Sequence, residues 1–429
     1  MSNVSLGIDF GTSNTVVALA TPGGVETLRF SHGEESIGVY ASALCFWQER
    51  RGQPPLAEGG PWAFDRLIDP TGPLRFLQSF KTLAASRNFQ STTIFGQRLS
   101  FEDMLAAFLR TLTRHSGLDF AGARVTIGRP VRFAGAAPDE ALAMQRYRDG
   151  FARLGIEGAT YVYEPVGAAF SFARSLEGEA TVLVADFGGG TSDFSVMRFA
   201  RVGGALKAEP LGQSGVGVAG DTFDSRIVDK VVAPHFGKGG SYRSFGKVLP
   251  MPSHLFARLS RWHELALMKG DMRDLRELAR DAVNPAPLEA FIDLVDRDLG
   301  FALYRSVSAL KVALSGAERA EFCFEDVRAW VTRAEFEGWI AGDLAKIAAA
   351  VDAALAAAGL RPGQVDKVFL TGGTSFVPAV QRLFVERFGA GKLTSADQFE
   401  SIALGLALIG RTEKPESWGS GADDQTSEL

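Results

Sequence analysis

The feature that constrains the fold most is a short glycine-containing motif that occurs twice. Its first copy reads Asp-Phe-Gly-Thr-Ser-Asn at residues 9–14, and its second reads Asp-Phe-Gly-Gly-Gly-Thr-Ser-Asp at residues 186–193. A short apolar run precedes each copy and a strand-like run follows it. Two such runs joined by small residues are typical of a β-hairpin. The repeat therefore predicts two hairpins of matching design in two related halves of the chain.

Segments with helical spacing of apolar residues separate other short strand-like runs. Leu105, Leu109 and Leu112 share one face of a predicted helix at residues 100–115. Another predicted helix ends at Gly359. Strand-like runs at residues 125–127 and 368–370 lie between helical segments. This alternation predicts an α/β fold with helices packed against sheets, and the Gly- and Pro-rich stretch at residues 233–280 is expected to be a peripheral insertion.

The composition limits the cellular compartment and the classes of partner that we expect for this protein. The 429 residues carry a formal net charge of −5 and two cysteines, Cys45 and Cys323. Because the basic residues are dispersed, nucleic acid is not an expected partner. Two cysteines are too few for a disulfide scaffold or a cysteine-ligated metal site. The amino terminus lacks a secretory pattern and no apolar run could span a bilayer, so we expect a cytoplasmic protein without a membrane partner.

The two predicted hairpin tips suit phosphate binding. Glycine allows main-chain N–H groups to approach phosphate oxygens, and each tip also brings a hydroxyl group, from Thr12 or Thr191. Each copy is led by an acid, Asp9 or Asp186, that can hold a hydrated magnesium ion through its water molecules. Either tip alone would also suit an ordinary turn. The pair of tips, each with its own acid, favours a nucleotide triphosphate.

With these two motifs, the sequence resembles the actin, sugar-kinase and heat-shock ATPase superfamily. Four further segments are similar to motifs of its heat-shock protein 70 branch, the DnaK-type chaperones. They are a connecting motif at residues 163–169, the start of the second-lobe insertion at 220–226, an adenosine motif at 370–378 and a second connecting motif at 401–405. The resemblance covers residues 4–410, and the Arg-Ser-Phe-Gly-Lys stretch at 243–247 looks most like the short YegD-like members.

The resemblance implies a two-lobed actin-like ATPase fold, which is a duplicated ribonuclease-H-like fold, with a nucleotide cleft between the lobes. Lobe I would comprise residues 1–176, with a peripheral subdomain at 36–109, and would be completed by 393–411. Lobe II would comprise residues 177–392, with a peripheral subdomain at 219–339. Residues 412–429 are polar and are expected to form a disordered tail.

The resemblance also implies three catalytic residues. Lys81 matches a lysine that reaches the γ-phosphate, although a lone lysine is more often a solvated surface residue. Glu164, just before Pro165, matches a carboxylate that positions magnesium-bound water, and its alternative role is helix capping. Asp186 matches the acid nearest that water. Asp9, Asp186 and Asp193 are expected to hold the metal through water, and which acid acts as base stays open.

The predicted cofactors are ATP or ADP and Mg²⁺. The segments expected to bind the nucleoside depart from the family pattern. Ser308 stands where the family has a glutamate, and Val312 and Phe376 stand where it has two arginines that flank adenine. We predict that Phe376 stacks on one face of adenine. The expected nucleotide-binding residues are Gly11, Thr12, Ser13, Asn14, Gly188, Gly189, Gly190, Thr191, Gly220, Asp221, Lys311, Ser315, Gly372, Gly373, Thr374 and Phe376.

Two other patterns are set aside. Residues 215–220 spell the dinucleotide fingerprint Gly-x-Gly-x-x-Gly, but no convincing strand precedes them and no acid stands at the ribose position. The histidines, His32, His115, His235, His254 and His263, lack the spacing of a zinc site.

Three functions are consistent with this sequence. The first is a chaperone-like protein that binds ATP, hydrolyses it slowly and lacks a peptide-binding domain, with a protein client or co-chaperone as partner. The second is a small-molecule kinase of the same superfamily, against which the motif at Glu164 and Pro165 argues. The third is an actin-type filament or scaffold protein.

Overall fold

The computed structural model describes residues 4–69, 72–118, 120, 122–133, 137–174, 176–202, 205–260, 265, 272–297, 299–394 and 400–418. Contacts within the chain define two compact units. Unit 1 comprises Met1–Gly217, Ala348–Ser375 and Leu383–Leu429, and unit 2 comprises Val218–Ile347 and Phe376–Arg382. Both repeated motifs lie in unit 1. The division into lobes at residues 1–176 and 177–392 stays a prediction.

Unit 1 contains two sheets with the same topology. In each sheet the strand before the repeated motif pairs with the following strand in antiparallel fashion and with a later strand in parallel fashion. The predicted hairpins and the duplicated α/β fold are therefore confirmed. The first sheet consists of β13 (Thr160–Tyr163), β12 (Arg124–Arg129), β1 (Ser5–Phe10), β2 (Asn14–Thr21), β3 (Gly24–Thr27) and β6 (Tyr40–Ala41), the last paired with β2. The second consists of β16 (Ala205–Val216), β15 (Ser192–Val202), β14 (Glu179–Phe187), β21 (Lys367–Thr371) and β22 (Leu393–Thr394).

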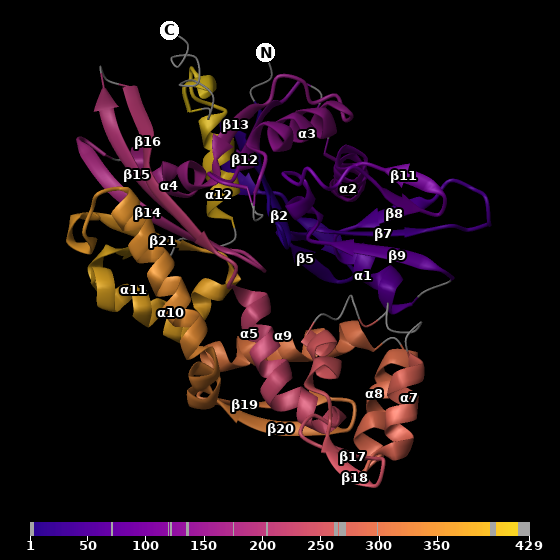
Figure 1. Cartoon of the computed structure of the whole chain (residues 1–429). Helices are drawn as coiled ribbons and strands as arrows, with labels where there is room; N and C mark the ends of the chain where they lie inside the picture. Colours follow the sequence, from indigo (N-terminus) through magenta and orange to yellow (C-terminus); the bar gives the residue numbers. More distant parts are fainter. Residues whose placement is uncertain are drawn as a thin grey trace. The chain divides into compact units, whose positions relative to one another are not determined.

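Two helices connect these sheets. Helix α12 (Ser401–Ile409) packs against β1, β2 and β12, and helix α4 (Glu164–Arg174) packs against β13, β14 and β15. Figure 1 shows the two helices side by side. Their closest approach is between backbones, because a Cβ added at Gly405 would lie 1.9 Å from the carbonyl oxygen of Gly167. Each of the two predicted connecting motifs supplies one glycine of this crossing.

A peripheral part of unit 1 surrounds an aromatic core that includes Phe10, Phe80, Phe108 and Tyr147. Its longest helix begins with the predicted capping box, in which Ser100 accepts a hydrogen bond from the Asp103 N–H and the Asp103 carboxylate accepts one from the Ser100 N–H. The elements are β4 (Phe30–His32), β5 (Glu35–Ile37), β7 (Ala43–Trp47), β8 (Leu56–Gly59), α1 (Pro61–Ile68), β9 (Leu74–Gln78), η1 (Phe80–Leu83), β10 (Thr92–Ile94), β11 (Gln97–Leu99), α2 (Phe101–Ser116) and α3 (Glu140–Ala152).

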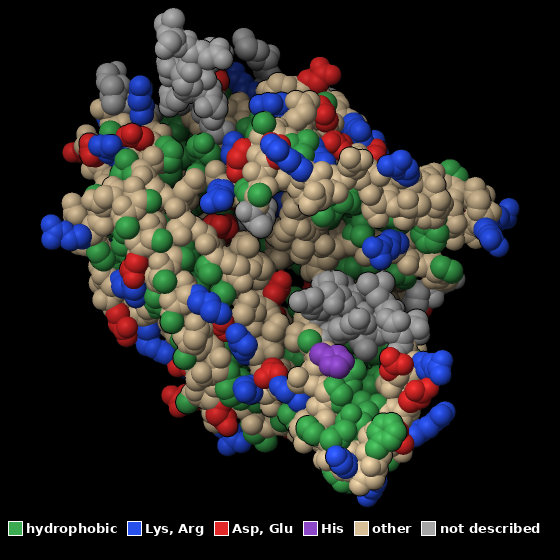
Figure 2. Space-filling model, in the orientation of Figure 1, with side chains coloured by type: hydrophobic (Ala, Val, Ile, Leu, Met, Phe, Trp, Pro, Cys, Tyr) green, Lys and Arg blue, Asp and Glu red, His purple; other side chains and the backbone are tan. Residues whose placement is uncertain are grey.

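Unit 2 is mainly helical, with two separate β-hairpins. A bidentate ion pair joins Arg226 to the buried carboxylate of Asp343, with nitrogen–oxygen distances of 2.8 and 3.0 Å. Hydrophobic side chains are exposed over the hairpin of β17 (Ser241–Ser244) and β18 (Lys247–Pro250) and over its neighbouring helices (Figure 2). The elements are α5 (Gly220–Ile227), η2 (Val228–Val232), η3 (Ala233–Phe236), β17 (Ser241–Ser244), β18 (Lys247–Pro250), η4 (Ser253–Ser260), α7 (Met272–Asp281), α8 (Ala286–Asp296), α9 (Gly300–Gly316), β19 (Arg319–Phe324) and β20 (Val327–Thr332).

The remaining helices follow β20 along the chain. Helices α10 (Arg333–Ala357) and α11 (Pro378–Phe388) each contain a boundary between the units. The predicted end of α10 is confirmed, because Gly359 adopts a positive φ of 67° just beyond the helix. The short helices are η6 (Pro362–Gln364), η7 (Gly373–Phe376) and η8 (Ala390–Lys392). Among the described residues, no helix combines the length and hydrophobicity that crossing a membrane requires.

The prediction of a disordered tail is wrong for its first part. Residues Pro415–Trp418 form the short helix η9. The ring of Trp418 lies 5.1 Å from that of Phe170 in α4 and joins the hydrophobic cluster around this helix. Partial burial of a large aromatic ring offsets the entropy of ordering the chain, which the polar composition alone did not indicate. Residues 419–429 lie outside the described residues.

The helix crossing predicts a position at which a helix-favouring substitution destabilises the protein. We expect Gly405→Ala to lower the free energy of unfolding by about 2 kcal/mol, because the new methyl group must displace the Gly167 backbone. Urea unfolding followed by circular dichroism measures this change. In Gly342→Ala on α10, the added Cβ meets nothing within 4 Å, so we expect a gain of up to about 1 kcal/mol. Equal effects of the two substitutions would contradict the close crossing.

Candidate functional site

The two hairpin tips have the same backbone geometry. The Gly11 N–H donates to the Asn14 carbonyl oxygen and the Gly188 N–H donates to the Thr191 carbonyl oxygen, each at 2.9 Å. The strand registers leave residues 11–14 in one turn and residues 188–191 in the other. A Cβ at Gly11 would lie 2.3 Å from the Asn14 oxygen, so this turn requires glycine. The likeness of the two motifs therefore extends from sequence to turn conformation.

A residue that the sequence did not single out holds the first tip. The Ser42 hydroxyl donates to the Gly11 carbonyl oxygen at 2.7 Å, and the Ser42 N–H donates to the Ser13 carbonyl oxygen at 2.8 Å. Ser42 is 1% exposed and also shares a hydrogen bond of 2.9 Å with Thr15. These contacts fix the first turn. The second turn contains Gly189 and Gly190, and Gly190 is exposed.

A buried ion pair lies beside these hairpins. The Lys81 ammonium donates to Glu164 Oε1 at 2.9 Å, and the two side chains are only 10% and 9% exposed. Lys81 lies in the short helix η1, and Glu164 is the first residue of α4, followed by Pro165. The alternative of a solvated surface lysine is therefore wrong. The predicted helix start at Glu164 is confirmed.

Three acids of the repeated motifs share this environment. Burial raises the pKa of Asp9 well above its usual value, and the neighbouring carboxylates of Glu164 and Asp186 raise it further. Burial and Glu164 likewise raise the pKa of Asp186, whose carboxylate accepts a hydrogen bond of 2.7 Å from Thr371. Because Asp186 raises the pKa of Asp9, and Glu164 raises the pKa values of both, the acids of the two hairpins lie in one charged cluster.

The charges of this cluster do not balance. Burial and the Asp186 carboxylate raise the pKa of Asp193 to about 7, although Thr191 donates a hydrogen bond of 3.1 Å to it. Burial alone would lower the pKa of Lys81, but Glu164 outweighs that effect and raises it. One ammonium group therefore faces four carboxyl groups, those of Asp9, Glu164, Asp186 and Asp193. Such a site suits an added cation.

A cavity of about 390 Å³ opens beside the cluster within unit 1. Glu164, Asp186, Thr191 and Asp193 line one part of it. The first hairpin does not contribute to its lining, so the cavity does not by itself bring the two tips together. Among the described residues, no group of three His, Cys, Asp or Glu side chains is placed to ligate a metal directly. Carboxylates can also hold a hydrated Mg²⁺ through its water molecules.

Unit 2 holds the second group of predicted site residues. The Lys311 ammonium forms an ion pair of 2.9 Å with Asp224 and donates to the Gly220 carbonyl oxygen at 3.4 Å. Burial raises the pKa of Asp224, and Lys311 opposes this rise. The Ser315 hydroxyl donates to the Lys311 carbonyl oxygen at 3.1 Å. The predicted residues Gly220, Lys311 and Ser315 thus lie together, with Asp221 on the same first turn of α5 as Gly220.

The two residues at the expected arginine positions are exposed. Val312 on α9 is 67% exposed and Phe376, at the end of η7, is 46% exposed. Gly372 and Gly373 lie between β21 and η7, and Thr374 is buried. Gly372 has a φ of 80°, and a Cβ there would lie 2.0 Å from the Phe187 carbonyl oxygen. The close approach of Gly372 to the end of β14 therefore demands glycine at this position independently of any ligand.

One reason for setting aside the fingerprint at residues 215–220 is wrong. Strand β16 runs directly into it and ends at Val216, and α5 begins at Gly220. Because β16 pairs only with the antiparallel strand β15 among the strands that the structure describes, the segment is not the parallel βαβ unit that binds dinucleotides. The sequence also missed Asp224 and Thr371, whose partners are distant in the chain. Their places inside two predicted motifs, at 220–226 and 370–378, were the available signal.

The duplicated fold, with an acid before each glycine-containing turn, is that of the actin-like ATPases. The Hsp70 protein family model matches residues 302–420. The chain is 26% identical over 424 residues to the chaperone protein DnaK of Thermus thermophilus, covering 94% of this chain and 60% of that protein. It is also 26% identical to the chaperone protein HscA homologs of Verminephrobacter eiseniae and Azotobacter vinelandii, covering 58% and 57% of them.

The chain is therefore similar to the Hsp70 family. It spans about three fifths of the length of the curated relatives that it matches.

The raised pKa of Asp193 predicts how stability depends on pH. The folded protein binds this proton up to about pH 7, whereas an unfolded aspartate loses it near its usual value of 3.8. The folded state therefore loses stability as the pH rises through this window. We expect the melting temperature of Asp193→Asn, relative to wild type, to rise between pH 4 and pH 7 in buffer without nucleotide or metal.

Asp139→Asn is the matched control. A hydrogen bond from the Leu142 N–H and a contact with Arg87 lower the pKa of Asp139, so its effect on stability varies only below about pH 4. The difference between this variant and wild type should be constant from pH 5 to pH 7. A constant difference for Asp193→Asn as well would show that Asp193 titrates normally.

Proposed function

We propose that this chain binds ATP or ADP with Mg²⁺ and slowly hydrolyses ATP, as the nucleotide-responsive part of a chaperone-like protein. The observation that carries the proposal is the buried Lys81–Glu164 pair, at 2.9 Å, in a cluster with the acids of both hairpins. Burying charged side chains is costly, and such clusters are often retained where they bind other charged groups. Phosphate oxygens and a divalent cation are such groups.

Each residue of the cluster has a proposed role. Lys81 supplies a fixed positive charge for the anionic γ-phosphate, and the main-chain N–H groups of the two turns donate hydrogen bonds to phosphate oxygens. Glu164 and Asp186 orient the attacking water and take up its proton, while Asp9 and Asp193 hold metal-bound water. A bound Mg²⁺ offsets the negative charge of the phosphates. The ion pair to Glu164 keeps Lys81 in place before the nucleotide arrives.

The residues Gly220, Asp221, Lys311, Ser315 and Phe376 are proposed to serve the nucleoside. Lys311 already has an acid partner, Asp224, which fixes its position rather than leaving it mobile. Phe376 offers an exposed ring where the family pattern has an arginine, so stacking replaces a guanidinium contact. A protein client or co-chaperone is the proposed partner, because the relatives are named as chaperone proteins. The likeness to short YegD-like members stays a prediction.

The proposed catalytic residues can be tested in single-turnover ATP cleavage. We expect Lys81→Ala, Glu164→Gln and Asp186→Asn each to slow cleavage by about 10²- to 10³-fold, because each removes a charge positioned for the transition state. ATP binding, followed by calorimetry, should persist. Lys230→Ala, which changes a lysine that is 53% exposed, should leave the rate unchanged. Unchanged rates in all three variants, or ATP-dependent phosphorylation of a sugar, would oppose the proposal.

The proposed stacking of Phe376 can be tested by nucleotide affinity. We expect Phe376→Ala to weaken ATP binding by roughly tenfold, since stacking of a base on an aromatic ring contributes about 1–3 kcal/mol. Titration with ATP and with GTP measures the loss and the base selectivity. Trp330→Ala removes another exposed aromatic ring of unit 2, 60% exposed, and should not change either affinity. Unchanged ATP affinity in Phe376→Ala would remove this residue from the site.

A further inference from the structure

A second hollow of unit 1 lies in its peripheral part, away from the charged cluster. It has a volume of about 440 Å³, which falls within the usual range of small-molecule sites. Strands β8 and β11 and helix α2 border it. Its apolar lining includes Phe46, Leu99 and Ala107. Over β8 and β11, hydrophobic groups and basic side chains face the viewer in Figure 2.

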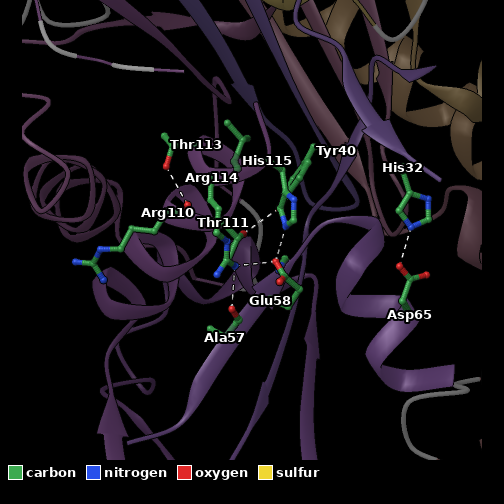
Figure 3. Close-up of polar contacts among 12 residues, drawn as sticks. His32, Tyr40, Ala57, Glu58, Asp65, Arg110, Thr111, Thr113, Arg114 and His115 are labelled. Carbon is green, nitrogen blue, oxygen red and sulfur yellow. Dashed lines mark hydrogen bonds and ion pairs between the residues drawn. The ribbon is translucent and has the colours of Figure 1, made fainter. Parts of the chain in front are cut away.

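The polar side of this groove carries one unbalanced positive charge. Arg110 lines the groove and is exposed, and its guanidinium has no hydrogen bond or ion pair within the described part of the chain. Figure 3 shows it extending from α2 away from Glu58. A free guanidinium beside an apolar surface can bind a carboxylate or phosphate with two parallel hydrogen bonds.

The second arginine of the groove is only partly engaged. One nitrogen of Arg114 donates to the Ala57 carbonyl oxygen at 3.2 Å and to Glu58 Oε1 at 2.9 Å, as drawn in Figure 3. His115 shares the same oxygen of Glu58 at 2.7 Å. The Arg114 side chain is still 55% exposed, so its other nitrogen atoms face solvent. Glu58 balances Arg114 and leaves Arg110 as the unpaired charge.

The acid of the groove does not cancel this charge. Asp103 is seven residues before Arg110 on α2, which places it about 10 Å away along the helix axis. It already has partners, because Arg153 forms an ion pair with it and Ser100 donates hydrogen bonds to it. Burial raises the pKa of Asp103, but these contacts outweigh burial and lower it. The groove therefore has a neutralised end and a positive end.

The groove suits a compact ligand better than an added strand. Within the described residues, strand β8 is the outer strand of the sheet β8-β7-β9, and β11 pairs only with β10. A peptide strand between them would need the carbonyl groups along the outer edge of β8. Arg114 already donates to one of them, at Ala57. An extended peptide would have to displace this contact, whereas a small anion would not.

We propose that this groove binds a small organic anion, with an apolar body on Phe46, Leu99 and Ala107 and a carboxylate or phosphate on Arg110 and Arg114. The proposal does not depend on the proposed nucleotide site, because no residue is shared between the two. The peripheral part of unit 1 thus has a ligand of its own.

The probe is 3-phenylpropionate, and its neutral isostere 3-phenylpropanamide and the small anion acetate are the comparison ligands. We expect the full chain to bind 3-phenylpropionate at least tenfold more tightly than either, because only it combines charge with an apolar body. Arg110→Glu should weaken binding of 3-phenylpropionate at least tenfold without affecting the fold, since the residue is exposed. Calorimetric titration gives the affinities.

Two further variants define the site. Ala107→Phe fills the groove and should abolish binding, with circular dichroism confirming that the helix is intact. Arg273→Ala removes an arginine of unit 2 that is 86% exposed and should bind like wild type. The proposal is overturned if wild type does not bind 3-phenylpropionate, if the amide or acetate binds as tightly, or if Arg110→Glu binds like wild type.

Discussion

The crossing of α4 and α12 is the constraint on which unit 1 depends. At Gly167 and Gly405 the two helix backbones touch, so neither position has room for a side chain. Helix α12 packs against the first sheet and α4 contacts strands of both sheets, so the helix pair joins the two copies of the fold. Glu164 lies at the start of α4, one helical turn before this contact. The packing that unites the sheets also places the acid of the charged cluster.

The cluster itself is held in an unfavourable state. Four carboxyl groups share a buried region with one ammonium group, and desolvation raises the pKa values of Asp9, Asp186 and Asp193. Groups that only stabilised the fold would be paired more evenly, as Arg226 and Asp343 are. Functional sites often retain such imbalance because a ligand completes the charge pattern. The imbalance here is the physical basis for proposing phosphate and magnesium.

Local patterns in the sequence predicted the hairpins, the capping box of α2 and the start of α4, because each depends on residues close together in the chain. The contacts of Lys81 and of Asp224 could not be predicted in this way. Lys81 meets Glu164 across 83 residues and Lys311 meets Asp224 across 87, so only the fold brings them together. The ordering of residues near Trp418 escaped prediction for the same reason, since Phe170 is distant in sequence. The roles of the site residues still rest on family resemblance.

The contact of Arg114 with the Ala57 carbonyl oxygen has a consequence for association between molecules. Outer strands of sheets expose backbone groups that can pair with strands of other chains and so promote aggregation. On β8, whose Leu56 is 43% exposed, a charged side chain covers part of that edge. The guanidinium blocks the hydrogen bond that an incoming strand would form there and places a charge at that edge. This arginine therefore also protects the concentrated protein against edge-to-edge assembly.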